Sequence, residues 1–464
     1  MITLLALLAC SGDTTIQFGD TASVVDTHLT DDTADTAPVD TGDTAEDPVL
    51  ADGITVAVHP EVATILVVSW NQLAPGDTWL SWELDGETHT SPVRARDGGV
   101  ASEVVLGLPA DTTVPLTLHV SVGGVDVPHG IGLAATDPLP SAILAPTLTL
   151  SSPGADPAPY LLTSVNVGPQ NFFGPCAVVI LDRQGRVVWY HLVSDRRLTL
   201  FPRVAKDGTH ILWDATTYYV AGTPSITRAT LSFSQSVETE IPSMGFTYDE
   251  LPDGSFLYDE AESGYAYHLT RRSPDGTDER IWSCAPWMSA YSNGYWACAP
   301  NTVLWEPATN LVFWSMFETS TVVALDLDTG EMAWELGQYT GGLAFSPSDI
   351  RIELQHYPNP TPDGNVLLTA HVPGRTEQHI REFAIADGVA TQVWDYVAEA
   401  GYYGVYAGEA TRLPEGNTLV NFGTDGVLQE ITPDKEVVWE IDWANHLPGH
   451  ATPLEDLYAL DRGW

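Results

Sequence analysis

Histidine and arginine gather in one short stretch of an otherwise acidic chain. The sequence has 62 Asp and Glu against 18 Lys and Arg, a formal net charge of −44. Five of its rarer side chains nevertheless fall within 26 positions: His356, His371, Arg375, His379 and Arg381. A neutral imidazole is a good nucleophile near pH 7, and Arg side chains supply positive charge, so this stretch is a candidate for local chemistry in an acidic chain. The alternative is that His371 and His379 are ordinary surface residues.

Other patterns that could carry chemistry are weaker. His446 and His450 have the spacing of a zinc pair on a helix, but Pro448 lies between them and predicts a loop. No EF-hand spacing and no local Ser-His-Asp motif occurs, although surface carboxylates leave calcium binding open. We therefore expect no metal site and no cofactor.

The charge of the chain restricts its partners. A strongly negative surface repels the phosphates of nucleic acids, so we expect no nucleic-acid partner. It also repels anionic lipid headgroups. An active site for an anionic ester would therefore need local positive charge.

The first residues resemble an export signal. The run MITLLALLAC ends in a lipobox-like Leu-Leu-Ala-Cys, so cleavage before Cys10 would leave its thiol to carry a lipid. Residues 11–50 are rich in Asp, Glu and Thr, without Lys or Arg, and predict a disordered stalk. Ser11 stands where a retention aspartate could be, which favours the outer membrane or cell surface of a Gram-negative bacterium. The alternative is a buried strand with an incidental cysteine.

Three further cysteines remain. Cys284 and Cys298 flank the segment APWMSAYSNGYWA, and in an oxidising compartment they could form a disulfide across it. The alternative is two buried thiols. Cys176 is then left as a core residue.

The elements that position these residues are short β-strands. Residues 52–145 alternate apolar and polar side chains in runs such as ATILVVSWNQ and PLTLHVSVGG, with turn residues every eight to twelve positions. This pattern, with Trp70 on its second strand, resembles a fibronectin type III β-sandwich. A linker rich in Pro, Ala and Ser separates it from the remainder.

Residues 159–464 repeat a hairpin unit. Five turn-and-strand segments recur: KDGTHILWD, PDGSFLYDE, ATNLVFWSM, PDGNVLLTA and PEGNTLVNF. Each repeat closes on a strand that contains a tryptophan, at Trp189, Trp282, Trp334, Trp394 and Trp439, while a unit near 220–242 lacks one. Six units of about 50 residues predict a six-bladed β-propeller, because a closed ring buries both faces of every blade. The tryptophans should pack between blades.

Residues 322–337 fit A-x-D-x-x-x-G-x-x-x-W, a blade-docking motif of propeller quinoproteins. A quinone-dependent dehydrogenase is therefore one alternative. Those enzymes have eight blades and often adjacent cysteines, whereas this chain predicts six blades and has no Cys-Cys pair.

The second half of the propeller resembles a narrower family. From residue 354 to 443 an ordered series of short motifs occurs: Gln355-His356, Gly364-Asn365, Arg381-Glu382-Phe383, Trp394-Asp395-Tyr396 and LPEGNTLV. In this order they are similar to the bacterial aryl-sulfate sulfotransferases, which move a sulfuryl group from a phenolic sulfate ester to another phenol without a nucleotide donor. The resemblance covers about 245–442.

The resemblance implies roles for individual residues. His356 matches the histidine that carries the sulfuryl group transiently. Asn301 matches the Asn of the family's His-x-Asn-Ser/Thr segment, and is a candidate to bind substrate. Tyr248, His371 and Arg375 are further candidates to bind substrate. An aryl sulfate and a phenol would be the partners, and a lipid anchor the contact with the membrane.

Three positions depart from the family pattern. Ala299 stands where the family has a His, Phe317 where it has an Arg, and Tyr248-Asp249-Glu250 where it has His-His-Asp. Loss of preorganised cations costs on the order of 3 kcal/mol per group at such a site. The alternative function is a catalytically inactive propeller that binds an aromatic or glycan ligand at the cell surface.

Overall fold

The computed structural model describes most of the chain beyond residue 47. The described residues are 48–152, 158–166, 175–193, 197–216, 222–262, 267–288, 298–337, 342–372, 376–399, 401–444 and 446–462. The predicted signal peptide, Cys10, most of the predicted stalk and Arg375 lie outside them. Helices there are limited to α1 (Cys284–Met288) and two 3-10 turns, Gly423–Asp425 and Tyr458–Leu460. None of the described helices is long and apolar enough to cross a membrane.

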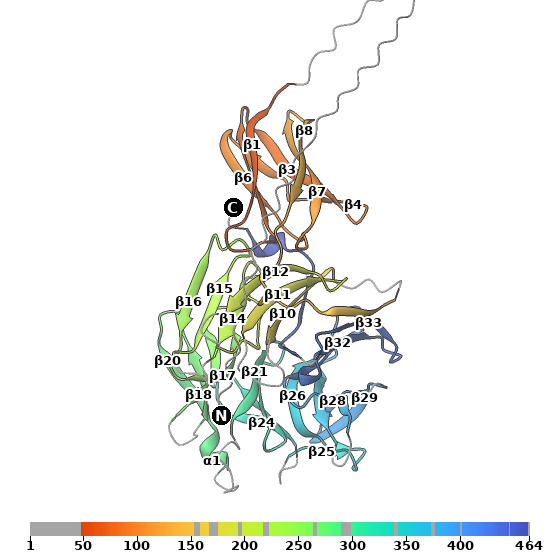
Figure 1. Cartoon of the computed structure of the whole chain (residues 1–464). Coiled ribbons are helices and arrows are strands. Elements are labelled where there is room, and N and C mark those ends of the chain that lie inside the picture. The colour runs from red at the N-terminus through yellow and green to blue at the C-terminus, as the bar shows by residue number, and fades with distance from the viewer. Residues whose placement is uncertain are drawn as a thin grey trace, which may run out of the picture. The chain divides into compact units, whose positions relative to one another are not determined.

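Residues 51–135 form two sheets that share a core (Figure 1). The first has the order β1-β2-β6, and the second the order β4-β3-β7-β8, with β5 also paired to β3. Their bounds are β1 (Ala51–Val58), β2 (Leu66–Gln72), β3 (Gly76–Leu84), β4 (Glu87–Thr90), β5 (Arg94–Arg96), β6 (Gly99–Val105), β7 (Thr113–Val122) and β8 (Val125–Ala135). Alternate residues such as Val68, Leu80 and Leu118 are buried between the sheets, which is the two-residue period expected of strands with one covered face.

The described chain beyond residue 146 contains six small sheets. The first three comprise β10 (Tyr160–Asn166), β11 (Cys176–Asp182) and β12 (Val187–Val193); β13 (Arg203–Val204), β14 (Ile211–Ala215), β15 (Ser225–Ala229) and β16 (Ser236–Glu240); and β17 (Met244–Glu250), β18 (Phe256–Ala261), β19 (Tyr267–Arg272) and β20 (Asp278–Ser283). Consecutive strands pair antiparallel within each sheet.

The last three sheets follow the same plan. They comprise β21 (Pro300–Glu306), β22 (Leu311–Met316), β23 (Thr321–Asp326) and β24 (Met332–Gly337); β25 (Ala344–Ser346), β26 (Glu353–Pro360), β27 (Val366–His371), β28 (Gln378–Ala386) and β29 (Val389–Val397); and β30 (Gly408–Arg412), β31 (Thr418–Phe422), β32 (Val427–Ile431) and β33 (Val437–Asp442). Only β25 runs parallel to its neighbour, β29, among the strand pairs of these sheets. The prediction of an all-β chain built from small antiparallel sheets is confirmed.

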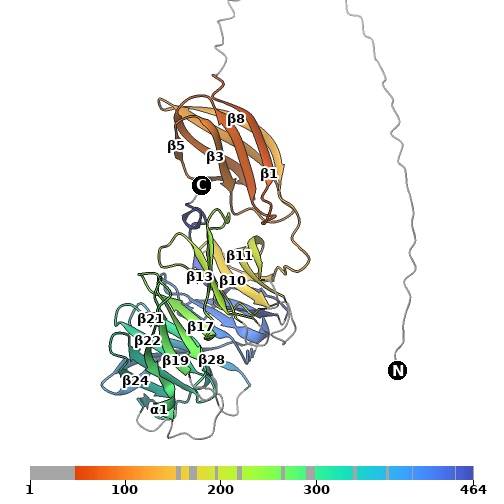
Figure 2. The same cartoon turned by 90° about the vertical axis from the view of Figure 1, so that its left-hand side faces the viewer.

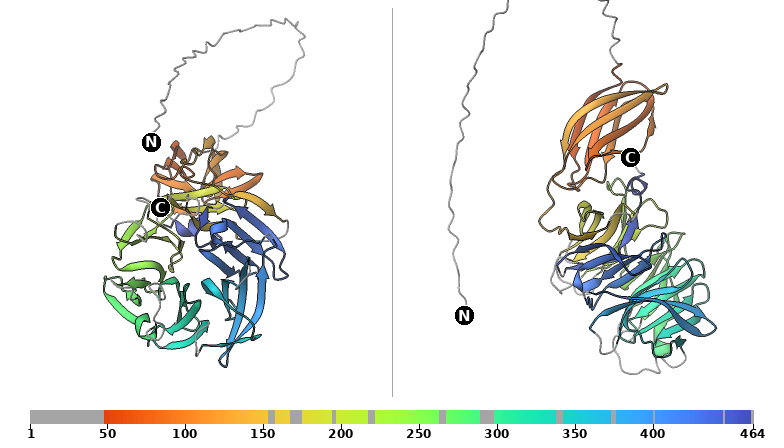
Figure 3. Two further views of the ribbon diagram at one scale, coloured as in Figure 1. Left: turned by 60° about the horizontal axis from the view of Figure 1, so that its bottom comes forward. Right: turned by 90° about the vertical axis from the view of Figure 1, so that its right-hand side faces the viewer.

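The two ends of this part of the chain complete each other's sheets. The late strands β34 (Leu447–Pro448) and β35 (Thr452–Leu454) pair with β10, and the early strand β9 (Thr147–Ser151) pairs with β33. The six sheets follow one another around a ring in chain order (Figure 3, left). One edge strand of each of the last four sheets contacts the corresponding strand of the next sheet: β17 contacts β21, which contacts β26, which contacts β30 (β17 and β21 in Figure 2).

The five predicted tryptophans occupy one structural position. Each lies on the last strand of its repeat, directly after a β-bulge on that same strand. The tryptophan pairs with the neighbouring strand in Trp189–Ile180 and Trp439–Glu430, and the residue before each tryptophan is the extra one. The same register holds for Trp282, Trp334 and Trp394. A bulge inserts one residue and turns the strand, which aims the large ring at the next sheet. The strands β15 and β16, in the unit that lacks a tryptophan on its last strand, pair without a shift.

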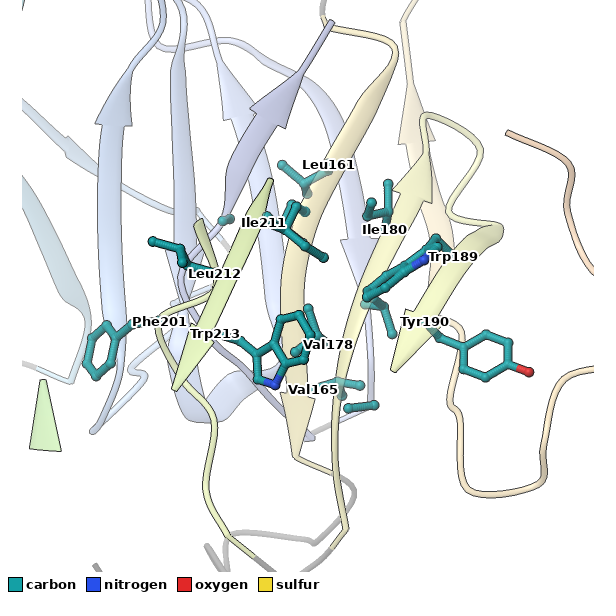
Figure 4. Packing of buried hydrophobic residues seen from close by; sticks show 14 of the residues in the cluster. Leu161, Val165, Val178, Ile180, Trp189, Tyr190, Phe201, Ile211, Leu212 and Trp213 are labelled. Carbon is teal, nitrogen blue, oxygen red and sulfur yellow. The ribbon is translucent and has the colours of Figure 1, made fainter. Parts of the chain in front are cut away.

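These rings join neighbouring sheets. The indole N–H of Trp189 donates to Leu231 O in the second sheet (2.7 Å), and that of Trp439 donates to Arg183 O in the first sheet (2.8 Å). Figure 4 shows Trp189 among the buried side chains of the first two sheets. The predicted packing between repeats is therefore confirmed for these residues.

Replacing Trp439 with phenylalanine should lower stability by about 2 kcal/mol. The variant would leave Arg183 O without its donor and remove part of the ring that the Arg183 guanidinium covers at 4.4 Å. Chemical denaturation of the two proteins measures the difference. Trp79→Phe, in the β1–β8 part of the chain and only partly buried, serves as the control and should cost clearly less. Equal losses of stability in the two variants would show that the contact of Trp439 with the neighbouring sheet adds no stability beyond that of a partly buried tryptophan.

Candidate functional site

His356 lies on a distorted segment of β26. The pairing of β26 with β27 shifts register on both sides of His356, and the flanking residues Leu354 and Tyr357 have positive φ angles of 49° and 46°. Such angles are unfavourable for residues with a Cβ and persist only where surrounding contacts enforce them, often at functional sites. Because of these two positive φ angles and the register shifts, the side chain of His356 does not follow the regular alternation of the strand.

Neighbouring polar side chains hold this segment in place. The buried Gln355 amide donates to Met316 O at 2.8 Å and to Thr321 O at 3.1 Å, both in the fourth sheet. Asn301 Nδ2 donates to Gln355 O at 2.6 Å. Gln355 and Asn301 therefore fix the backbone that carries His356. Asn301 was predicted to bind substrate; it does line the cavity described below, but its amide N–H is engaged with the backbone.

The His356 ring is oriented as a neutral nucleophile. Its Nδ1 lies 3.1 Å from Leu354 O, an acceptor, so the proton belongs on Nδ1 and the lone pair on Nε2. Burial, with a smaller contribution from the charge of His371, lowers the pKa of His356 to about 3. The ring thus stays neutral at any physiological pH. No hydrogen bond to Nε2 is found among the described residues.

His356 opens onto a cavity of about 790 Å³. Its described lining includes six aromatic residues and four carboxylates, and no Lys or Arg. The aromatic members are Phe201, Phe246, Tyr267, Phe317, Tyr357 and Tyr406, and the carboxylates are Asp259, Glu262, Glu318 and Glu409. Phe317 meets the His356 ring edge-on at 5.1 Å between centroids and lies 5.7 Å from Tyr406. The arrangement suits a flat aromatic molecule placed against His356.

A second histidine on the cavity, His450, was not predicted. It lies between the closing strands β34 and β35, and its backbone N–H donates to Leu200 O at 2.7 Å. Its Nδ1 lies 2.6 Å from Glu409 Oε1, and its ring stacks on Tyr357 at 4.8 Å. The sequence showed His450 only as a rejected zinc-pair candidate. Its place on the cavity depends on ring closure, which brings the chain end back to the first sheet.

Two predicted substrate-binding residues do not reach the cavity. Tyr248 is fully buried between sheets, where its hydroxyl donates to Phe201 O at 3.0 Å and the Arg203 guanidinium covers its ring at 4.7 Å. His371 is buried at the end of β27, with its ring against Tyr403 at 4.3 Å. Arg375 lies outside the described residues.

Two of the three departures from the family pattern lie at the cavity wall. Ala299 and Phe317, which replace a His and an Arg of that pattern, both line the cavity. Their apolar side chains therefore face the space in which a ligand would be held.

Cys284 and Cys298 form the predicted disulfide. The bond ties α1 to the residue that precedes Ala299 and Pro300, two residues of the cavity wall. Cys176 is unpaired and buried, and burial raises the pKa of its thiol to about 12, so it is an inert core residue. No group of three or more His, Cys, Asp or Glu able to hold a metal ion occurs in the described part of the chain.

Asp259 should make stability fall as the pH rises. Burial raises its pKa to about 7, although it accepts hydrogen bonds from the Phe246 and Thr247 N–H groups. Between about pH 4 and 7 the unfolded chain loses a proton that the folded chain keeps, so folding is progressively penalised. Asp259→Asn cannot ionise, and should gain about 2 kcal/mol relative to wild type between pH 5 and 7.

Denaturation of both proteins at several pH values tests this. A difference that stays constant with pH would show that the Asp259 carboxyl is already ionised in the folded protein.

No protein-family model matches the chain, and no curated protein is similar to it. Solved structures of low similarity exist. A protein of unknown function from Bacteroides caccae is 12% identical over 64% of this chain and 100% of its own, with a TM-score of 0.43. A Lactobacillus plantarum protein is 12% identical over 80% and 98%, with a TM-score of 0.40.

Virginiamycin B lyase from Staphylococcus aureus is 11% identical over 67% of this chain and 89% of its own, with a TM-score of 0.37. Likenesses at this level carry no argument about the activity of the chain.

Proposed function

We propose that residues 159–464 form a six-bladed β-propeller and that residues 52–145 form a fibronectin type III-like module before it. The six sheets in chain order, the shared position of five tryptophans and the mutual completion of the first and last sheets support this architecture. The ordered motifs between residues 354 and 443 favour an aryl-sulfate sulfotransferase-like protein.

The function proposed for the cavity is sulfuryl transfer from a phenolic sulfate ester to a phenol. In the first step His356 Nε2 attacks sulfur, an N–S bond forms and the S–O bond to the phenol breaks, and the departing phenolate takes up a proton. In the second step the oxygen of another phenol attacks sulfur, the N–S bond breaks and the phenol gives up its proton. A covalent intermediate divides one difficult transfer into two easier ones.

The observation that carries this proposal is the state of His356. Its Nδ1 is tied to Leu354 O, its pKa is lowered to about 3 by burial, and it borders a cavity rich in aromatic side chains. A neutral imidazole with a free Nε2 is a competent nucleophile, and the aromatic wall can hold a phenyl ring by stacking.

The test is transfer from 4-nitrophenyl sulfate to phenol by the purified protein. We expect release of 4-nitrophenol that depends on the acceptor, and a peptide containing His356 heavier by one SO₃ group when the acceptor is omitted. Release of nitrophenol without a product sulfate, or no release in either low or high salt, would exclude the transferase.

A second candidate function is binding without turnover. The described lining contains four carboxylates and no Lys or Arg, an unfavourable setting for the charge of a sulfuryl group. A catalytically inactive propeller that holds an aromatic or glycan ligand would show ligand-dependent thermal stabilisation and no product. A phenyl glycoside and a phenyl sulfate compared in the same melting experiment distinguish the two candidates, because only the binding protein would favour the uncharged compound.

The location proposed for the protein is the cell surface or outer membrane, through a lipid on Cys10. The Cys284–Cys298 disulfide agrees with an oxidising compartment. In a bacterial host, Cys10→Ala should move the protein from the membrane fraction to the soluble fraction. Equal membrane retention of both forms would exclude the anchor.

A further inference from the structure

Glu409 and His450 form a hydrogen-bonded pair on the cavity wall, and neither residue has a role in the attack by His356 described above. Glu409 is 3% exposed, and its Oε1 lies 2.6 Å from His450 Nδ1. The same carboxylate accepts hydrogen bonds from the Thr411 hydroxyl and the Ala451 N–H, both at 3.2 Å. Three donors thus hold the carboxylate, and the carboxylate in turn fixes the plane of the imidazole.

The pair leaves the other ring nitrogen available to the cavity. Both His450 and Glu409 line the cavity, and no hydrogen bond to His450 Nε2 is found among the described residues. With Nδ1–H directed to Glu409, Nε2 is the atom that can accept or return a proton. A carboxylate that orients a histidine in this way is the usual support of an acid-base imidazole.

His450 is also close to the nucleophile. Its ring stacks on Tyr357, the residue directly after His356, at 4.8 Å and 22° between planes. Tyr357 packs against Phe201 on the same wall of the cavity, at 6.1 Å. The two imidazoles therefore border one cavity, which Tyr357 also lines. The acid-base role proposed below requires a phenyl ring in this cavity to contact both imidazoles.

We propose that His450, oriented by Glu409, is the general acid and base of the site. This inference rests on the proposed sulfuryl transfer. As the S–O bond of the donor breaks, protonated His450 gives its Nε2 proton to the phenolate oxygen. The now neutral His450 then takes the hydroxyl proton of the second phenol as its oxygen attacks the sulfur on His356. The proton returns to His450, so the cycle balances with no other reactant.

Leaving-group dependence separates this role from a structural one. 4-Nitrophenolate is a stable anion and needs little protonation, whereas phenolate needs a proton to leave. For His450→Gln we expect kcat/KM to fall by about 10² to 10⁴ with phenyl sulfate as donor, and by less than about tenfold with 4-nitrophenyl sulfate. Glu409→Gln should give the same preference with smaller losses. His446→Gln, four residues earlier in the chain and outside the described cavity lining, is the matched control and should change neither value.

The outcomes are distinct. Equal losses with both donors for His450→Gln and Glu409→Gln would overturn the acid-base assignment and leave sulfuryl transfer intact. No transfer by wild type from either donor would overturn the proposed function, and the assignment with it. Melting temperatures of the variants show whether each is folded, and if His450→Gln is not, the Glu409→Gln ratio decides.

Discussion

His356→Gln should abolish sulfuryl transfer, with a loss of at least about 10³-fold in kcat. Glutamine fills a similar volume and can still donate to Leu354 O, but it has no nitrogen lone pair able to attack sulfur. Without a covalent intermediate, transfer would require both substrates to react directly in one step. The measurement is product formation from 4-nitrophenyl sulfate and phenol, followed until the uncatalysed rate is resolved.

A control variant tests whether replacing a histidine outside the cavity lining also lowers activity. His210→Gln changes a residue of the second sheet that bonds Asp207 and does not line the cavity, so its kcat should equal that of wild type. The His356→Gln protein should also fail to gain the mass of one SO₃ group when mixed with donor alone. Retention of more than a tenth of wild-type activity would show that His356 is not the nucleophile.

The same variant separates the two candidate functions. A transferase loses turnover on His356→Gln but keeps the aromatic wall, so donor should still raise its melting temperature. A protein that only binds shows no turnover before or after the change. The lining carboxylates make the second outcome a real competitor, since the described wall offers His450 but no Lys or Arg to meet a sulfuryl group.

Short-range sequence patterns predicted the hairpin units from which the small sheets are built. Turn residues and a tryptophan at a fixed place in each repeat gave the hairpin units, and the structure shows the same bulge beside each of the five rings. These signals are local because a bulge and a hairpin turn are decided within a few residues. The completion of the first sheet by β34 and β35 could not be predicted in this way, because it joins strands almost 300 residues apart.

Residues of the candidate site could be predicted only where local sequence decides their place. His356 follows from the Gln-His motif, and Gln355 and Asn301 fix its backbone. Tyr248, predicted to bind substrate, is buried away from the cavity, and it follows a register shift within β17, between Met244 and Tyr248, that no composition signal reveals. His450 was missed because its neighbours Glu409, Leu200 and Tyr357 come from three other sheets.

Arg203→Met should destabilise the protein by about 3–5 kcal/mol, because it breaks a buried ion pair. Arg203 Nη1 lies 2.6 Å from Asp249 Oδ1, and the two side chains are 8% and 0% exposed. Removing the cation would leave a buried carboxylate that retains the Trp305 and Glu250 N–H groups and Lys206 at 3.9 Å. Chemical denaturation measures the loss.

A double-mutant cycle shows how much of this cost is the pair itself. Asp249→Asn alone should also be destabilising, because it leaves the guanidinium buried without its charge partner, while Arg203→Met with Asp249→Asn should recover most of the loss. The exposed pair Lys435–Asp395, at 3.2 Å, is the control, and Lys435→Met should cost less than about 1 kcal/mol. Additive losses in the cycle would contradict the pairing.

The Arg203 guanidinium also contacts a residue of the candidate site. Arg203 Nη2 donates to the Tyr357 hydroxyl at 3.3 Å, and Tyr357 follows His356 and carries the stacked His450 ring. Loss of Arg203 should therefore reduce transfer even at temperatures where the variant is folded, because the positive φ of Tyr357 is held by such contacts. If folded Arg203→Met transfers at the wild-type rate, Tyr357 keeps its place without the guanidinium, and the cation serves only to hold the second, third and fifth sheets together.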